Sequence, residues 1–479
     1  MVPFVNAASL NGIWSQPEKA ILFVIKEVDN KPIVDAVYNY TQGIPYCVYD
    51  KYDSESMKNY FSNGIIAYET KNKINLKRFK TSFNEPFIKL KQLPVECKKP
   101  LETQDPQKNY SVLWQFFNEY YANFDLRIGS RTEWERLGEY YRSQIDNQTS
   151  DKKLFDLTST LLSKLEDGHV ELYYQGDFEQ GMEVDYEPRK DITAFDQAFR
   201  DSYNLEAGTK EYIEQIGKSL VNSFHLIDSN YLTQANHGQE QSLSMPGFPS
   251  QPVYTWGVLK LKPEVGYARI LQELHFKGSP IESTDEQYQQ ATQTIDQMMA
   301  FYKQQDIKAL IIDLRYNVGG DNAINNYLLH YLINKKTTVL KQQSYIDGIA
   351  QPLIEFTLSP RKESIRSQDN LFPIYVLSSS YTISSGENLV LSLMALANTK
   401  NIGYTTRGIF SDTHTRTLPN GWIFQLPFNK IFAFNNLSYE KVGIPAHTPV
   451  DPSNNYLMKT YMDTEQDLIL DKLIDEVVF

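Results

Sequence analysis

The sequence YTISSGE at residues 381–387, followed by the apolar run NLVLSLMAL at residues 388–396, decides the fold of this chain. The β-type run IYVL at residues 374–377 precedes it, so we predict a strand, a turn of small residues and a buried helix. The turn places Ser384 at the corner between strand and helix, beside the N–H groups of a helix N-terminus. A serine there can act as a nucleophile next to half of an oxyanion hole. It can equally be a simple N-cap, so other segments must decide.

A second strand and turn lie upstream, in the sequence ALIIDLRYNVGG at residues 309–320. The apolar strand ends in Gly319 and Gly320, and glycine permits a positive φ and a close approach of the backbone to a ligand. Strands alternate with helical patterns over residues 253–479, which predicts βαβ crossovers and a mostly parallel sheet. Because ligands bind at the carboxyl ends of such strands, we expect Gly319 and Ser384 to lie at the same edge.

Five patterns, in this order, resemble those of the C-terminal-processing, or tail-specific, serine peptidase family. They are DLRYNVGG at 313–320, TISSGE at 382–387, IGYTTRG at 402–408, LPNG at 418–421 and YEKVGI at 439–444. The resemblance covers roughly residues 255 to 452. It implies an α/β peptidase core of the ClpP/crotonase type, with Ser384 as the nucleophile.

The base that activates this serine differs from the lysine of common family members. That lysine would stand at position 409, which is Ile409 here, and Arg407 cannot replace it because a guanidinium stays protonated. The chain instead resembles the tricorn-like branch of the family, which uses a histidine with a supporting glutamate. The segment LLSKLEDGHV at residues 161–170 resembles the one that carries the histidine, which makes His169 the expected base.

Glu440 stands where the tricorn-like branch has its supporting carboxylate. A neutral imidazole would take the proton of Ser384, and a carboxylate would fix its tautomer and stabilise the imidazolium. In that branch a serine precedes the histidine, whereas this chain has Gly168, so the hydroxyl is absent or supplied from elsewhere.

The expected oxyanion hole uses the N–H of Ser385 and one N–H from the pair Gly319 and Gly320.

Three further residues are alternatives or have structural roles. His447 lies near Glu440 in the sequence and is a rival base, and His414, in a predicted hairpin, is a second rival. Glu387 lies in the first turn of the predicted helix, where the helix dipole favours a carboxylate, so we assign it a structural role.

Four zones follow one another along the chain. Strands separated by turn residues predict a small β-barrel or sandwich domain, and aromatic residues at i, i+3 and i+4 spacing predict a helical cap. We expect the third cap helix to end in a C-cap at Gly168. We see no PDZ-like pattern in the third zone. The zones are residues 1–100 (β-domain), 105–168 (helical cap), 169–252 (a strand with a helical insertion and loop) and 253–479 (α/β core).

Composition restricts the classes of function. The net charge of −12 and pI of about 5.2 argue against a nucleic-acid binder. No run of about 18 apolar residues is present, so we expect no transmembrane helix. The start, MVPF, shows no signal peptide, and we expect an exported protein whose signal peptide is absent from this chain.

The two cysteines, Cys47 and Cys97, belong to no C-x-x-C or His-rich cluster, so we expect no metal site and no cofactor. They either pair, which would imply an oxidising compartment, or are two separate buried thiols.

Three functions fit these observations. The first is a serine endopeptidase that cleaves peptides or protein tails through a Ser-His-Glu acyl-enzyme mechanism. The second is a catalytically silent relative that binds a peptide, an apolar ligand or a sugar. The third is an acyl-transfer hydrolase with non-peptide substrates.

Overall fold

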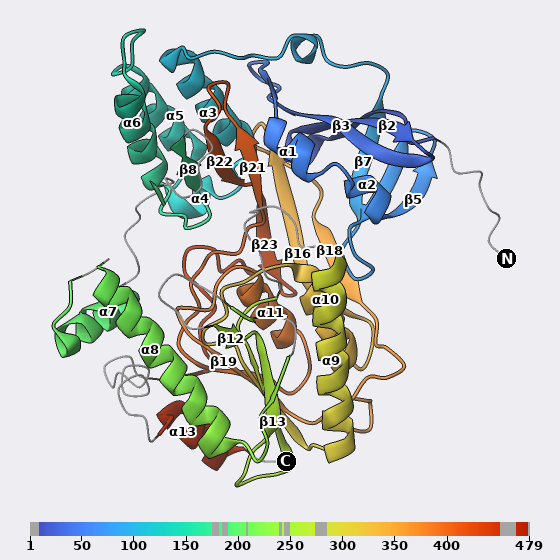
Figure 1. Cartoon of the computed structure of the whole chain (residues 1–479), viewed down its shortest axis with the longest axis vertical. Helices are drawn as coiled ribbons and strands as arrows, with labels where there is room; N and C mark the ends of the chain where they lie inside the picture. Colours follow the sequence, from blue (N-terminus) through green and yellow to red (C-terminus); the bar gives the residue numbers. More distant parts are fainter. Residues whose placement is uncertain are drawn as a thin grey trace.

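The C-terminal half of the chain is built around a seven-stranded sheet, which lies in the lower half of the view in Figure 1. The computed structural model describes residues 9–174, 182–183, 190–206, 209–238, 242–243, 250–273, 285–450 and 466–477. In spatial order the strands are β10 (Asn236–His237), β13 (Tyr254–Val258), β14 (Val265–Ile270), β15 (Ala309–Asp313), β19 (Ile374–Ser378), β20 (Thr399–Gly403) and β24 (Thr448–Pro449). The strands from β14 to β24 are parallel, and β10 and β13 are antiparallel additions at one edge.

Helices cover both faces of this sheet. On one face lie α9 (Asp285–Gln305), α10 (Asn322–Leu332) and α11 (Ser385–Met394), and on the other lie α8 (Lys210–Leu226) and α13 (Leu468–Glu476). Strand β15 shows why: Leu310 and Ile312 pack toward the first group of helices, whereas Ala309 and Ile311 pack toward the second. Successive side chains of a strand point to opposite faces, so a strand buried on both sides is apolar throughout. The predicted α/β core is confirmed.

The N-terminal strands form a separate seven-stranded antiparallel sheet with its own aromatic core. In spatial order these are β4 (Cys47–Tyr49), β3 (Lys31–Tyr40), β2 (Ile21–Val28), β1 (Gly12–Gln16), β7 (Glu85–Leu90), β6 (Lys73–Lys77) and β5 (Ile65–Thr70). They form one sheet and not the two facing sheets of a sandwich. Helices α1 (Lys51–Ser56) and α2 (Tyr60–Asn63) interrupt the strands where the sequence analysis predicted only β-structure.

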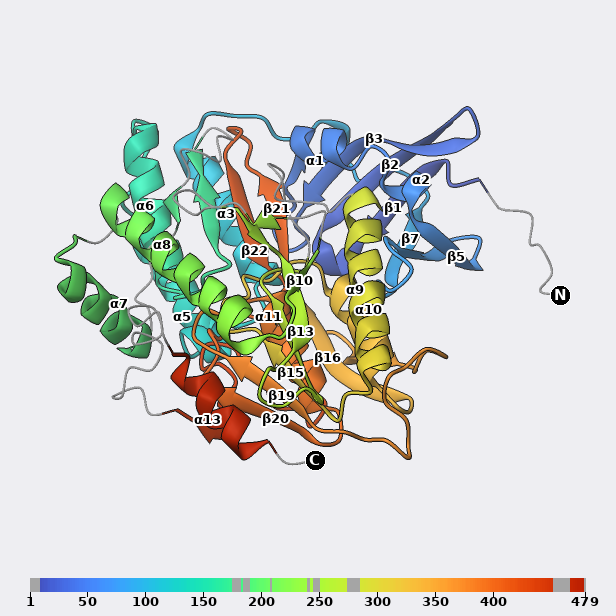
Figure 2. The ribbon, with the colours of Figure 1, turned by 60° about the horizontal axis from the view of Figure 1, so that its bottom comes forward.

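The N-terminal sheet lies beside α9 and α10 (Figure 2), and the loop after β6 contacts the core. Arg78 forms an ion pair with Asp285 at the start of α9, with 2.9 Å between nitrogen and oxygen. The ring of Phe79 stacks on Tyr288 at 4.3 Å between ring centroids. The loop after β6 therefore packs against the first turn of α9.

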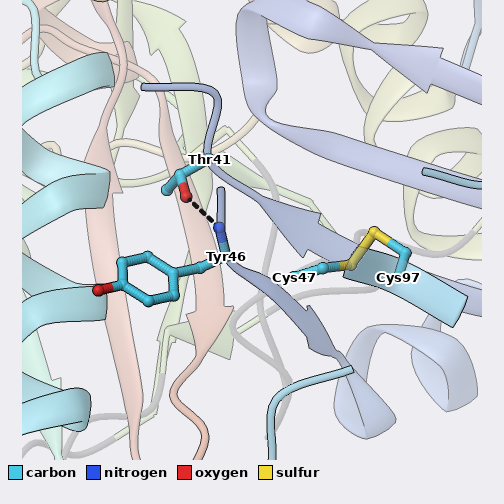
Figure 3. The surroundings of a disulfide bond; sticks show 4 residues. All are labelled: Thr41, Tyr46, Cys47 and Cys97. Carbon is cyan, nitrogen blue, oxygen red and sulfur yellow. Dashed lines mark hydrogen bonds between the residues drawn. A yellow bond between two sulfur atoms is a disulfide. The ribbon is translucent and has the colours of Figure 1, made fainter. Parts of the chain in front are cut away.

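A disulfide closes the N-terminal sheet (Figure 3). It joins Cys47 on β4 to Cys97 in the 3-10 turn Glu96–Lys98. Beside it, the Tyr46 N–H donates to the Thr41 hydroxyl at 2.9 Å. Of the two alternatives that the sequence left open, the structure has the paired cysteines.

The helical cap consists of α3 (Pro106–Tyr120), α4 (Phe124–Arg127), α5 (Arg131–Arg142) and α6 (Asp151–Ser163). Strand β8 (Glu171–Tyr173) continues from the cap and pairs with β22 (Ile423–Pro427) of the core, which itself pairs with β21 (Thr413–Thr417). The expected C-cap at Gly168 is wrong: α6 ends at Ser163, and Glu166, with φ 48°, takes the left-handed position.

The remaining strands extend the core beside the cap. β16 (Thr337–Ile346) pairs with β17 (Ile349–Ala350), β18 (Ile354–Leu358) and β23 (Asn429–Ala433). Among the described residues, none of the helices is long and apolar enough to span a membrane.

Candidate active site

Ser384 occupies the turn between β19 and α11, with φ 55° and ψ −125°. This backbone conformation is unfavourable for a residue with a side chain and costs about 1–3 kcal/mol, which the surrounding structure must supply. The Ser384 N–H donates to the Ile409 carbonyl at 3.0 Å, and its own carbonyl accepts from Asn388 N–H at 3.0 Å. Its hydroxyl caps no helical N–H. The simple N-cap is therefore not the role of this side chain.

A glycine turn lies directly against Ser384. Gly319 has φ 88°, and a Cβ added to it would lie 2.7 Å from the Ser384 Cβ and 3.2 Å from the Ser385 nitrogen. Only glycine fits this contact. The two turns thus meet as expected for parallel strands.

The backbone donors of the two turns are not equivalent. The Gly319 N–H donates to the Asn317 side-chain oxygen at 2.8 Å, so it is unavailable to a substrate. For the N–H groups of Ser385 and Gly320, the described residues provide no acceptor. Of the two predicted glycines, only Gly320 therefore remains a candidate oxyanion donor, together with Ser385.

A cavity of about 1000 Å³ opens over these turns. Its walls come from all three parts of the molecule: the N-terminal sheet, the cap segment and the core. Ser384, Gly320 and His169 all line it. The structure thus brings the predicted nucleophile, one oxyanion donor and the predicted base to one space.

His169 lies in the segment between α6 and β8. Its main-chain N–H donates to the Asp167 carboxylate at 3.0 Å, which fixes the loop. Burial lowers the pKa of the ring below its ordinary value of 6.5, while the charge of Asp167 and a hydrogen bond to the main-chain carbonyl of Ser411 oppose this shift. Within the described part of the chain, the ring atom Nδ1 is buried without a partner. A neutral imidazole with a free lone pair is what a general base requires.

Glu440 is completely buried, but its partner is a cation. Its Oε1 accepts a hydrogen bond from Arg127, and its Oε2 accepts the Phe410 N–H at 3.1 Å. Burial raises the pKa of Glu440, and Arg127 opposes this rise. Among the described residues Glu440 makes no hydrogen bond to His169.

Ser411 lies between the expected base and the expected carboxylate. Its carbonyl contacts the His169 ring, and its hydroxyl is 3.5 Å from Glu440 Oε2 while it donates to the Asn429 carbonyl at 2.6 Å. Glu440 therefore lies beside Ser411 without receiving its hydroxyl proton, which goes to Asn429.

Arg127 joins the cap to this cluster. Its guanidinium contacts Glu440 and the Gly408 carbonyl and lies 3.8 Å from Asp167. Burial alone would lower the pKa of Arg127, but Asp167 and Glu440 raise it above its ordinary value, so it stays charged. Sequence reasoning missed Arg127 and Ser411, because neither stands in a motif.

The rival histidines differ in position. His447 lies between β20 and β24, where its Nδ1 accepts the Asn401 N–H at 3.1 Å, and it does not line the cavity. His414, on β21, does line the cavity and stacks on Phe428 at 4.4 Å between centroids. Burial holds the pKa of His414 well below 6.5.

Two other residues support the turn of Ser384. Glu387 accepts the Gly408 N–H at 2.6 Å and the Ile409 N–H at 2.8 Å, and burial raises its pKa to about 8. Since the Ile409 carbonyl accepts from Ser384, Glu387 fixes the nucleophile indirectly. The Ile409 side chain is buried, so the position of the family lysine is occupied by an apolar residue.

Part of this chain resembles known proteins. Residues 266–450 match peptidase family S41. A search of curated proteins found no match. A putative peptidase from Parabacteroides merdae has a similar structure, with 18% identity, a TM-score of 0.54, and coverage of 79% of this chain and 100% of that chain.

Two further structures are more distant. Mature CPAF has 12% identity, covers 78% of this chain and 98% of its own, and gives a TM-score of 0.48. The photosystem II D1 C-terminal processing protease has 12% identity, covers 76% and 98%, and gives a TM-score of 0.43. At these identities the likeness concerns the fold alone.

Proposed function

Because residues 266–450 belong to peptidase family S41, whose members are serine peptidases, we propose that this chain is an endopeptidase with Ser384 as its nucleophile and His169 as its base. Its substrates are peptides or unfolded protein tails. The observation that carries the assignment is the strained turn of Ser384, whose hydroxyl caps no helix and which shares a cavity with His169.

In the first half of the reaction His169 accepts the Ser384 hydroxyl proton while the oxygen attacks the peptide carbonyl. The N–H groups of Ser385 and Gly320 bind the oxyanion that forms. The imidazolium then gives its proton to the leaving amine, and an acyl-enzyme remains. In the second half a water molecule gives a proton to His169 and attacks the ester, which releases the acid and restores Ser384.

The imidazolium is stabilised by charge in this scheme. Asp167 is the carboxylate that acts on the His169 ring, and Glu440 belongs to the same buried cluster through Arg127. Arg127 balances the two carboxylates, so that the cluster carries one net negative charge near the developing cation. We therefore propose that Glu440 supports the base as part of this cluster.

We also propose that the protein is exported. The disulfide between Cys47 and Cys97 supports this, because disulfides persist in oxidising compartments.

The test is cleavage of an unfolded protein, reduced and carboxymethylated α-lactalbumin, followed by mass spectrometry of the products. The wild type should cleave it, and Ser384→Ala and His169→Ala should not, although both should keep the wild-type melting temperature. His447→Ala serves as the matched histidine control and should cleave normally. Cleavage by Ser384→Ala would refute the proposal, and turnover of small esters alone would favour a non-peptide hydrolase.

A further inference from the structure

Glu273 is a buried carboxyl group directly behind the glycine turn, and the reaction scheme above does not use it. It follows β14 and is fully shielded from solvent. Its Oε1 accepts a hydrogen bond from the Asn317 side-chain nitrogen at 2.9 Å. Its Oε2 is buried, with no partner among the described residues. A buried carboxyl group is costly, so its retention at this position requires a reason.

The side chain of Asn317 connects Glu273 to the glycine turn. Its side-chain nitrogen donates both to Glu273 and to the Ile270 carbonyl, at 3.1 Å. Because both neighbours of this nitrogen are acceptors, the amide cannot flip, and its oxygen must face the Gly319 N–H, which it accepts at 2.8 Å. The main-chain carbonyl of Asn317 also accepts the Ile383 N–H at 3.0 Å, one residue before the nucleophile.

Glu273 holds the other side of Gly319 as well. The Glu273 main-chain N–H donates to the Gly319 carbonyl at 3.1 Å. In a trans peptide the carbonyl and the N–H point in opposite directions, so the Gly320 N–H of the same peptide unit points away from Glu273. Gly320 lines the cavity of Ser384. The Asn317 oxygen thus holds the Val318–Gly319 peptide and the Glu273 main chain holds the Gly319–Gly320 peptide, so the two bonds fix the glycine turn on both sides of Gly319.

We propose that Glu273 is a positioning residue: through Asn317 it fixes the Val318–Gly319 peptide, and with it the glycine turn in which the Gly320 N–H faces the oxyanion. The inference rests on the proposed peptidase function. Burial raises the pKa of Glu273 to about 8, while its bond to Asn317 opposes the rise. A neutral acid at this place holds the amide without setting a negative charge behind the oxyanion.

Steady-state kinetics on a quenched-fluorescence peptide that the wild type cleaves test this proposal. Glu273→Leu removes the acceptor, so kcat should fall about 10²–10³-fold, the usual effect of one lost oxyanion donor, with KM changed less than about threefold. Glu273→Gln keeps a neutral acceptor at the same reach and should restore kcat to within about tenfold of the wild type. Glu273→Asp should fold but draw the acceptor back by one methylene, and should lose kcat like Glu273→Leu.

Glu119→Leu is the matched control. Glu119 is an equally buried glutamate that accepts the N–H groups of Gln42 and Gly43, at 2.7 and 2.6 Å, and it does not line the cavity. This variant should lower the melting temperature and keep kcat.

The outcomes separate the two hypotheses. Should Glu273→Leu not fold, Glu273→Asp decides. If Glu273→Leu or Glu273→Asp folds and keeps the kcat of the wild type, or changes only KM, the positioning role is overturned. The proposed peptidase function would not be affected by that result. A wild type that cleaves no peptide and resists serine reagents would overturn the proposed function itself, and the inference with it.

Discussion

Replacing Gly319 by alanine should damage both catalysis and stability. The new Cβ would lie 2.7 Å from the Ser384 Cβ and 3.1 Å from the Ile383 carbonyl oxygen. Neither neighbour is the flexible end of a long side chain, so the nucleophile turn or the glycine turn must shift. Such a shift separates the N–H groups of Ser385 and Gly320 from the position of the oxyanion.

The expected magnitudes follow from this geometry. Alanine at φ 88° costs about 1–2 kcal/mol of backbone energy, and the overpacked contact adds about 1–3 kcal/mol. The free energy of unfolding should therefore fall by about 2–5 kcal/mol. Loss of one oxyanion donor lowers kcat about 10²–10³-fold. Urea unfolding and peptide-cleavage kinetics measure the two effects separately.

Gly129→Ala is the matched control for this substitution. Gly129 has the same φ of 88°, and a Cβ added to it meets no atom within 4 Å. It should lose only about 1–2 kcal/mol of stability and keep its kcat. A folded Gly319→Ala enzyme with the kcat of Gly129→Ala would show that the glycine turn does not shape the oxyanion hole.

Three further predictions concern the base, the buried ion pairs and the disulfide. Since activity needs neutral His169 and burial lowers its pKa, the midpoint of the acid-side decline of kcat/KM should lie below pH 6.5. Asp167→Asn removes an anion that raises this pKa, so the midpoint should move to lower pH, and a move to higher pH would contradict the scheme. Arg127→Met leaves Asp167 and Glu440 buried without a counter-charge, so the free energy of unfolding in urea at pH 8 should fall by about 3–5 kcal/mol. The loss should be smaller at pH 5, where Glu440 can be protonated, and equal losses at both pH values would argue against the pairing. Replacing Cys47 and Cys97 by alanine opens a loop of 50 residues and should lower the free energy of unfolding by about 4 kcal/mol, while peptide cleavage stays unchanged. Unchanged stability would mean that the thiols are not paired in solution.

The sequence predicts those parts of this site that depend on local pattern. Apolar strands that end in small residues have few alternatives, so the turns at Gly319 and Ser384 are visible in the sequence, as is their meeting at one sheet edge. The strand before Ser384 ends within one residue of its predicted position, and the helix after it begins three residues earlier than the apolar run at 388–396.

The sequence does not predict contacts between side chains that are distant along the chain. Arg127 reaches Glu440 across 313 residues, and no periodicity or spacing records that pairing. The same holds for Glu273, whose role depends on the orientation of one amide group. The motif itself contains Asn317, but only the structure shows that its oxygen binds the Gly319 N–H and so removes that donor from the expected pair.

The loop that carries His169 shows a different limit. A glycine after a helix is a common C-cap, yet here Glu166 adopts the left-handed conformation. The Glu166 carbonyl accepts a hydrogen bond from Arg127, and its carboxylate lies 3.1 Å from Lys441. Local preference alone would assign the left-handed conformation to Gly168. In the structure Glu166 adopts it, and Glu166 is the residue that contacts Arg127 and Lys441.

The measurement that tests the central claim most directly is labelling with a fluorophosphonate, followed by mass spectrometry of the modified peptide. Such reagents react with a serine only when a base activates it. The wild type should carry one label, on Ser384, and His169→Ala should carry none while His414→Ala, the rival base that lines the same cavity, is still labelled. Label on Ser384 that survives in His169→Ala and disappears in His414→Ala would contradict the assignment of the base. A folded wild type without label would contradict the claim that Ser384 is a nucleophile.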